Sequence, residues 1–157
     1  MIVGWYTKRW GIELYHRTMK SGRRIEDRQL QKAEGLLPCL AVEMVVAWRI
    51  LLMTHLGRVQ PQQPCTAIFQ EVEWQALYIL IFASRQFPQT PPTVAEVVRW
   101  TAQLGGFLGR KRDGHPGVMT LWKGLRKVVV AATVWSIVSG QEYQREEIVE
   151  IQHLDDG

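Results

Sequence analysis

Residues 118–138, VMTLWKGLRKVVVAATVWSIV, predict a long amphipathic helix that decides the class of this fold. Apolar residues recur at intervals of three and four positions, which places them on one face of an α-helix. That face comprises Leu121, Leu125, Val128, Val129, Ala132 and Trp135. A face with this much apolar surface must pack against another element.

The rest of the chain shows a similar helical pattern, interrupted by segments rich in glycine and proline. Thr93 is a plausible N-cap for a helix that runs to about residue 104, because Glu96 three residues later completes a capping box. Gly57 is the expected stop of the helix predicted at about 31–55. Further helices are predicted at about 5–20, 31–55 and 71–84. We therefore predict a mainly α fold.

The composition is that of a globular protein without a membrane span. Of the 157 residues, 46% are apolar and 22% are charged, which suffices for a hydrophobic core. The most hydrophobic stretch, residues 36–56, is interrupted by Glu43 and Arg49 and is too polar at its centre to cross a bilayer. The N-terminus lacks the pattern of a signal peptide. We expect a soluble, cytoplasmic chain with no membrane partner.

The two cysteines and four histidines do not form a metal site in the sequence. Cys39 and Cys65 lack the spacing of a zinc motif, so two reduced thiols are expected. The histidines are scattered along the chain.

Positive charge is concentrated in two segments. The net charge is only +4, but residues 1–35 hold eight Lys or Arg against four acids, and residues 99–127 hold seven against one. This distribution is typical of a protein that follows a phosphate backbone. Residues 141–157 are acidic and are expected to be a solvated tail; a DNA mimic or a handle for a partner is the alternative.

A stripe of polar residues lies on one face of the helix predicted at about 5–20. Tyr6, Arg9, Glu13, Arg17 and Lys20 share this face because their spacing follows a turn of about 3.6 residues. A carboxylate can ligate magnesium, and arginine and lysine bind phosphate oxygens. The alternative is a solvated face with i, i+4 ion pairs, each worth only about 0.2–0.5 kcal/mol.

Two sequence blocks resemble a known family. YTKRWGIE at 6–13, continued to Lys20, resembles the Y-(2)-R-(3)-E-(6)-K signature of bacterial cut-and-paste DDE transposases of the IS-four group, including the Tn-five-like ones. A second block resembles the region near the C-terminus of the same proteins. It consists of LGGF at 104–107, KRDG at 111–114 and LWKG at 121–124.

The resemblance implies a helical C-terminal fragment of an RNase H-like transposase catalytic domain, with its C-terminal dimerisation helices. Glu13 matches the third catalytic carboxylate of the family and would be a metal ligand. The two catalytic aspartates have no counterpart, because none of the residues before Glu13 is an aspartate. A complete member uses two Mg²⁺ (or Mn²⁺) ions for phosphoryl transfer. We expect this chain alone not to hold them and to be inactive.

The resemblance also implies that DNA, at transposon ends, is a partner. Tyr6, Arg9 and Lys20 would contact the phosphate backbone beside the cleavage point. Other cationic candidates for DNA contact are Arg17, Arg23, Arg24, Lys111 and Arg112. Ordinary solvated loops are the alternative for the clusters at 23–28 and 110–112.

Three parts of the chain follow from these blocks. Residues 1–57 would be the end of the RNase H-like core, residues 58–140 a helical dimerisation region, and residues 141–157 the acidic tail. We predict a DNA transposition protein that forms homodimers, or mixed dimers with an intact transposase. Because the upstream sheet is missing, the apolar face of helix 118–138 would pair two copies, and charges at Leu125 and Val129 would separate them.

Two alternatives to a transposase fragment remain open. The first is a non-catalytic DNA-binding or dimerising module that inhibits an intact transposase by forming mixed dimers. The second sets the resemblance aside and describes a helical interaction protein. The sequence of the gene upstream of Met1 would separate the fragment from the inhibitor.

Overall fold

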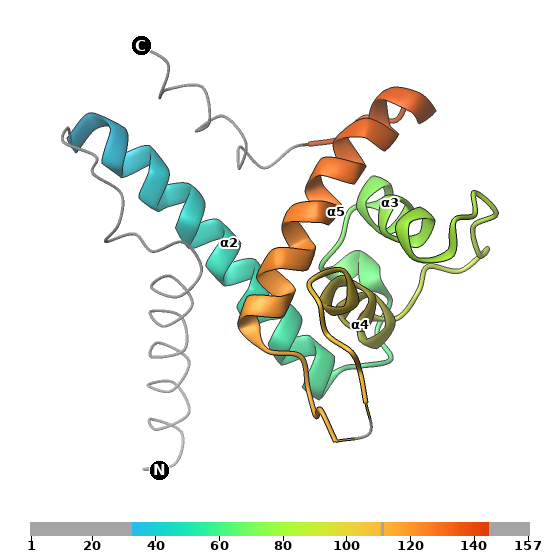
Figure 1. The fold of residues 1–157 in the computed structure, drawn as a ribbon. Coiled ribbons are helices and arrows are strands. Elements are labelled where there is room, and N and C mark those ends of the chain that lie inside the picture. The colour runs from blue at the N-terminus through green and yellow to red at the C-terminus, as the bar shows by residue number, and fades with distance from the viewer. Residues whose placement is uncertain (1–32, 111, 145–157) are drawn as a thin grey trace. The chain divides into compact units, whose positions relative to one another are not determined.

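The computed structural model describes residues 33–110 and 112–144, and side chains from residue 44 onward (Figure 1). These residues form α2 (Ala33–Val59), the 3-10 turn η2 (Cys65–Ala67), α3 (Glu71–Phe82), α4 (Val94–Leu104) and α5 (Val118–Ser139). In this part of the chain, extended pairing is limited to an isolated bridge between Pro64 and Thr93. The prediction of a mainly α fold is confirmed. The helix predicted at about 5–20 lies outside the described residues.

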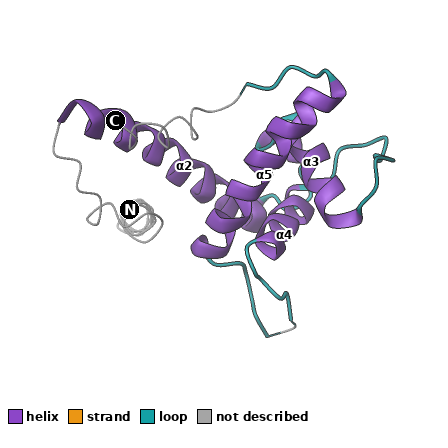
Figure 2. Ribbon diagram, turned by 45° about the horizontal axis from the view of Figure 1, so that its top comes forward, coloured by secondary structure: helices purple, strands orange, loops and turns teal. Residues whose placement is uncertain are grey.

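Two compact units divide the chain. Among the described residues, 33–51 belong to one unit, and 52–110 and 112–144 belong to the other. In the second unit, α5 packs against both α3 and α4, and α4 also contacts η2. Figures 1 and 2 both show α5 lying alongside α3 and α4. None of the described helices combines the length and hydrophobicity that a bilayer crossing needs.

Local signals in the sequence explain where α3 and α4 begin. The backbone N–H of Thr93 donates to Glu96 Oε2 at 2.8 Å, and Glu96 N–H donates to Thr93 Oγ1 at 3.3 Å, which is the predicted capping box. At α3, Gln70 N–H donates to Glu73 Oε2 at 2.9 Å. These side chains satisfy backbone donors that the first helical turn leaves unpaired.

Gly57 does not end α2, so that prediction is wrong. The helix continues through Gly57 to Val59, and Gln60 N–H still donates to the carbonyl of Leu56 at 2.9 Å. A single glycine weakens a helix by only about 1 kcal/mol and does not break it. Pro61, which has no N–H group, follows at the point where the chain leaves the helix.

The predicted apolar face of α5 is the core of the second unit and is not free to pair two copies. Leu121, Leu125, Val128 and Val129 are each at most 3% exposed. They pack where α5 meets α3 and α4. The expectation that this face joins two chains is therefore wrong, because neighbouring helices of the same chain bury it.

The segment after α5 folds back onto the start of α3. The hydroxyl of Tyr143 donates to Glu73 Oε1 at 3.1 Å, and Gln70 Nε2 donates to the carbonyl of Gln144 at 2.9 Å. The Tyr143 ring packs against a small cluster that contains Val72 and Ala132. Residues 141–144 therefore belong to the packed unit.

Glycines allow the backbones of α4 and α5 to touch. A Cβ atom at Gly124 would overlap the carbonyl oxygen of Thr101 and would lie 2.7 Å from its carbonyl carbon. A Cβ atom at Gly105 would overlap the carbonyl oxygen of Thr120 in the same way. Neither obstacle can move by a change of side-chain rotamer, because both are backbone atoms.

We predict that Gly124→Ala destabilises the fold by about 1–3 kcal/mol or more, because the two helices must separate to admit the methyl group. Urea unfolding followed by circular dichroism measures this loss. Gly57→Ala is the matched control. Its Cβ would lie 3.7–3.9 Å from side-chain atoms of Val98, an ordinary van der Waals distance, so it should be neutral or slightly stabilising. Equal unfolding midpoints for Gly124→Ala and the unmodified chain would contradict the close contact.

Cys65 is a fully buried free thiol in η2. Burial raises the pKa of this thiol from 9.0 to about 12, and the charge on Glu96 adds to the increase. The unfolded thiol ionises above about pH 9, whereas the folded one stays protonated until about pH 12. The contribution to stability is therefore complete below pH 9 and is lost as the pH rises across this window.

We predict that the free energy of unfolding falls more steeply between about pH 9 and pH 12 in the unmodified chain than in Cys65→Ala. Urea titrations at several pH values measure both slopes. The variant serves as the control for the pH dependence that the rest of the chain contributes. Identical slopes would show that the buried thiol does not carry this linkage.

Candidate functional sites

An exposed apolar ridge runs along α5 on the side opposite the core. Val130, Val134, Ile137 and Val138 form this ridge, and they are 59%, 58%, 79% and 59% exposed. Their spacing of i, i+4, i+7 and i+8 places them within about 100° of the helix circumference. A continuous apolar surface of this kind is typical of a site that another molecule covers.

Polar groups beside the ridge are satisfied within α5 itself. The Thr133 hydroxyl donates to the carbonyl of Val129 at 2.9 Å, and the Ser136 hydroxyl donates to the carbonyl of Thr133 at 2.8 Å. These hydrogen bonds occupy the hydroxyl protons near the ridge. A partner could therefore cover it without removing those donors from water, which is the main cost of burying polar groups.

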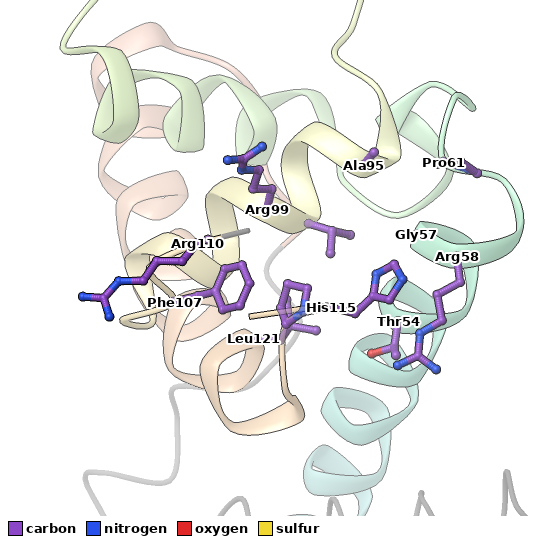
Figure 3. A pocket seen from close by; sticks show the side chains of 14 residues that line it. Thr54, Gly57, Arg58, Pro61, Ala95, Arg99, Phe107, Arg110, His115 and Leu121 are labelled. Carbon is purple, nitrogen blue, oxygen red and sulfur yellow. The ribbon is translucent and has the colours of Figure 1, made fainter. Parts of the chain in front are cut away.

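The second site is a pocket of about 450 Å³ within the second unit. Its walls come from the last turns of α2, from α4, from the loop that follows α4, and from the start of α5. Figure 3 shows Phe107 and His115 on opposite sides of the hollow, with Arg99 above Phe107 and Arg58 near His115. Arg110 extends outward from the rim.

The lining of the pocket carries positive charge and no carboxylate. Arg58, Arg99 and Arg110 contribute guanidinium groups and His115 contributes an imidazole; among the residues that the structure describes, no Asp or Glu lines the pocket. All four side chains are exposed to solvent. Asp113 lies in the same loop, but its carboxylate accepts the backbone N–H of Arg110 at 2.8 Å and caps a turn. The pocket is therefore suited to an anion.

Most of the predicted site residues lie outside the described part of the chain: Tyr6, Arg9, Glu13, Arg17, Lys20, Arg23, Arg24 and Lys111. Their predicted roles in catalysis and DNA contact remain predictions. Arg112 is described, is exposed, and sits in the loop between Arg110 and His115 without lining the pocket. Among the described residues, no three His, Cys, Asp or Glu side chains gather as metal ligands.

The sequence analysis missed three of the four basic residues that line the pocket: Arg58, Arg99 and His115. Arg58 stands near the end of α2 and Arg99 in the middle of α4, far from the loop that supplies Arg110 and His115. The cationic run at 110–112 signalled part of the site. No local motif joins Arg58 to Arg99, because only tertiary packing brings them to the lining of the same pocket.

Comparison with known proteins identifies the family. The sequence model described as "Transposase Tn5 dimerisation domain" matches residues 45–147, which is more than half of the chain. The chain therefore belongs to this family. The match contains the described part of the second unit, including the ridge and the pocket. No curated protein and no solved structure matched the chain.

Proposed function

We propose that this chain pairs two subunits of a cut-and-paste DNA transposase, and that the ridge on α5 is the pairing surface. Membership of a family of transposase dimerisation domains is the observation that carries this proposal. The ridge supports it, because Val130, Val134, Ile137 and Val138 remain more than half exposed in a single chain. The partner is a second copy of the same ridge.

The free energy available from the ridge indicates a dimer of modest strength. A two-fold pair covers the ridge of both copies, which is eight side chains that are 58–79% exposed in the single chain. Covering them is worth roughly 8–15 kcal/mol, taking about 1.5–3 kcal/mol for full burial of each. Association costs about 4–15 kcal/mol in lost translational and rotational freedom. The two ranges overlap, so the ridge alone supports a dissociation constant on the order of micromolar or weaker.

Charge along the same face of α5 favours an antiparallel arrangement. Lys123 and Arg126 are exposed and lie on the ridge side of the helix, but nearer its N-terminus. In a parallel pair these cations would face their copies and repel one another. An antiparallel crossing near Val134 keeps them apart, and a two-fold axis makes the ridge its own partner.

We predict that the double variant Val134→Glu, Ile137→Glu is a folded monomer. Both side chains are mostly exposed in the single chain, so the charges oppose pairing and disturb little of the internal packing. Sedimentation equilibrium at concentrations around the dissociation constant measures the association, and circular dichroism verifies the helices. Gln103→Glu, a charge added at an exposed position on α4, is the control. If the double variant associates as strongly as the unmodified chain, the ridge is not the pairing surface.

The N-terminal motif extends the proposal to catalysis. Glu13 would supply the third catalytic carboxylate and one ligand for Mg²⁺, and Tyr6, Arg9 and Lys20 would contact DNA phosphates at the transposon end. The support is the resemblance of residues 6–20 to the family signature. Arg17, Arg23, Arg24, Lys111 and Arg112 would add cationic contacts to the same DNA.

We predict that the purified 157-residue chain neither nicks nor joins DNA with Mg²⁺ or Mn²⁺. A two-metal site needs several ligands to hold two ions about 4 Å apart, and the motif here provides one carboxylate. Incubation with a labelled duplex followed by denaturing electrophoresis measures cleavage. Metal-dependent strand breaks that disappear in Glu13→Gln would overturn the prediction.

The ridge also supports inhibition as a second candidate function. A chain that pairs through α5 and carries one motif carboxylate would form mixed dimers with an intact transposase of its family. Such dimers would contain only one complete active site. Adding this chain to an intact partner would then reduce transposition, and the ridge variant would not.

A further inference from the structure

We propose that the cationic pocket binds single-stranded nucleic acid, with one unpaired base stacked on Phe107 and the backbone phosphates held by Arg58, Arg99 and Arg110. This inference goes beyond subunit pairing and does not depend on it. All lining residues belong to the second unit of one chain.

The charges around the pocket favour a polyanion over a single anion. Within the described residues, none of the three guanidinium groups forms an ion pair with a carboxylate. Figure 3 shows Arg99 and Arg110 on one side of the hollow and Arg58 on the other, so they do not converge on one point. A chain of phosphates can reach all of them, and releases counterions as it does so.

Phe107 provides a surface for a base beside these charges. The ring is only partly buried and borders the hollow in Figure 3. A Cβ atom at Gly109 would lie 3.5 Å from Arg99 Nη2 and 3.6 Å from Phe107 Cε1, so ring and guanidinium both border this glycine. Gly109 has a φ of +65°, which favours glycine, and its missing side chain leaves the space between them open.

The size of the pocket decides between a lone phosphate and a nucleotide. Its volume of about 450 Å³ lies within the range of small-molecule sites, about 300–1,000 Å³, and far exceeds a phosphate group. A base in a duplex is stacked between its neighbours and cannot lie against a protein ring. The occupant is therefore an unpaired nucleotide, which combines stacking on an aromatic ring with cationic backbone contacts.

An acidic peptide, such as the Glu-rich end of this chain, is the competing occupant. It would satisfy the arginines but would make no use of the Phe107 ring. The affinity that a stacked base adds therefore distinguishes a nucleic acid strand from an acidic peptide.

The experiment measures fluorescence anisotropy with labelled strands of about 10 nucleotides, within the usual site size of such proteins. An oligothymidylate is compared with an abasic strand that has the same number of phosphates, and with a duplex of the same length. We expect the thymidylate to bind the unmodified chain roughly fivefold to a hundredfold more tightly than the abasic strand. Phe107→Leu should remove this difference, and Phe107→Tyr, which retains a ring, should preserve it.

Arginine variants test the phosphate contacts. Arg58→Gln and Arg99→Gln should each reduce the slope of log affinity against log salt by about 0.7. Arg85→Gln is the matched control, because this arginine is exposed after α3 and does not line the pocket; its effect on the slope should be smaller. The ridge variant Val134→Glu, Ile137→Glu should still prefer thymidylate over the abasic strand, so failure of the dimer and failure of the pocket are distinguishable.

Three results would overturn the proposal. Equal affinity of the unmodified chain for thymidylate and abasic strands would exclude a stacked base without the need for any variant. Tighter binding of the duplex would show that the cations serve paired DNA. If polyglutamate displaces the labelled strand as well as unlabelled oligothymidylate does, at the same concentration of negative charge, the pocket is an acidic peptide site.

Discussion

The contact between the backbones of α4 and α5 is the constraint on which the second unit depends. Gly105, at the end of α4, lies against the backbone of Thr120 in α5. Gly124, in α5, lies against the backbone of Thr101 in α4. Two such contacts fix both the separation and the register of the helices. They also fix the two ends of the loop that joins α4 to α5. This loop thereby lines the pocket together with α4 and the end of α2, through Phe107, Gly109, Arg110 and His115.

The register of this crossing also determines which face of α5 meets solvent. With Leu121, Leu125 and Val128 directed toward α3 and α4, the ridge of Val130, Val134, Ile137 and Val138 necessarily faces outward. Trp135 marks the border between the two faces, and its indole N–H donates to Gln75 Oε1 at 2.9 Å. A single helix thus supplies part of the core on one side and an exposed apolar face on the other.

The ridge and the pocket occupy different ends of α5. Leu121 lines the pocket near the start of the helix, and Val134 lies at the centre of the ridge, about 20 Å farther along the helix axis. Pairing of subunits and binding of a nucleic acid strand would therefore not compete for the same surface. For a protein of a transposase dimerisation family, this separation would allow a paired subunit to hold DNA at the same time.

The sequence by itself determined the helical class of the fold, several helix limits and the family. Thr93 and Glu96 form a cap through residues three positions apart, and residues 104–124 carry a recognisable block, so both are visible without a structure. The helix face of Leu125 and Val129 was also visible, but the element that covers it was not, and the expectation of a second chain there was wrong. Only the tertiary structure decided that the opposite face forms the ridge, and that Arg58 and Arg99 meet a loop near residue 110. Periodicity reports which side chains share a face, whereas the choice of neighbour depends on how closely two backbones can approach. Here that approach is set by Gly105 and Gly124.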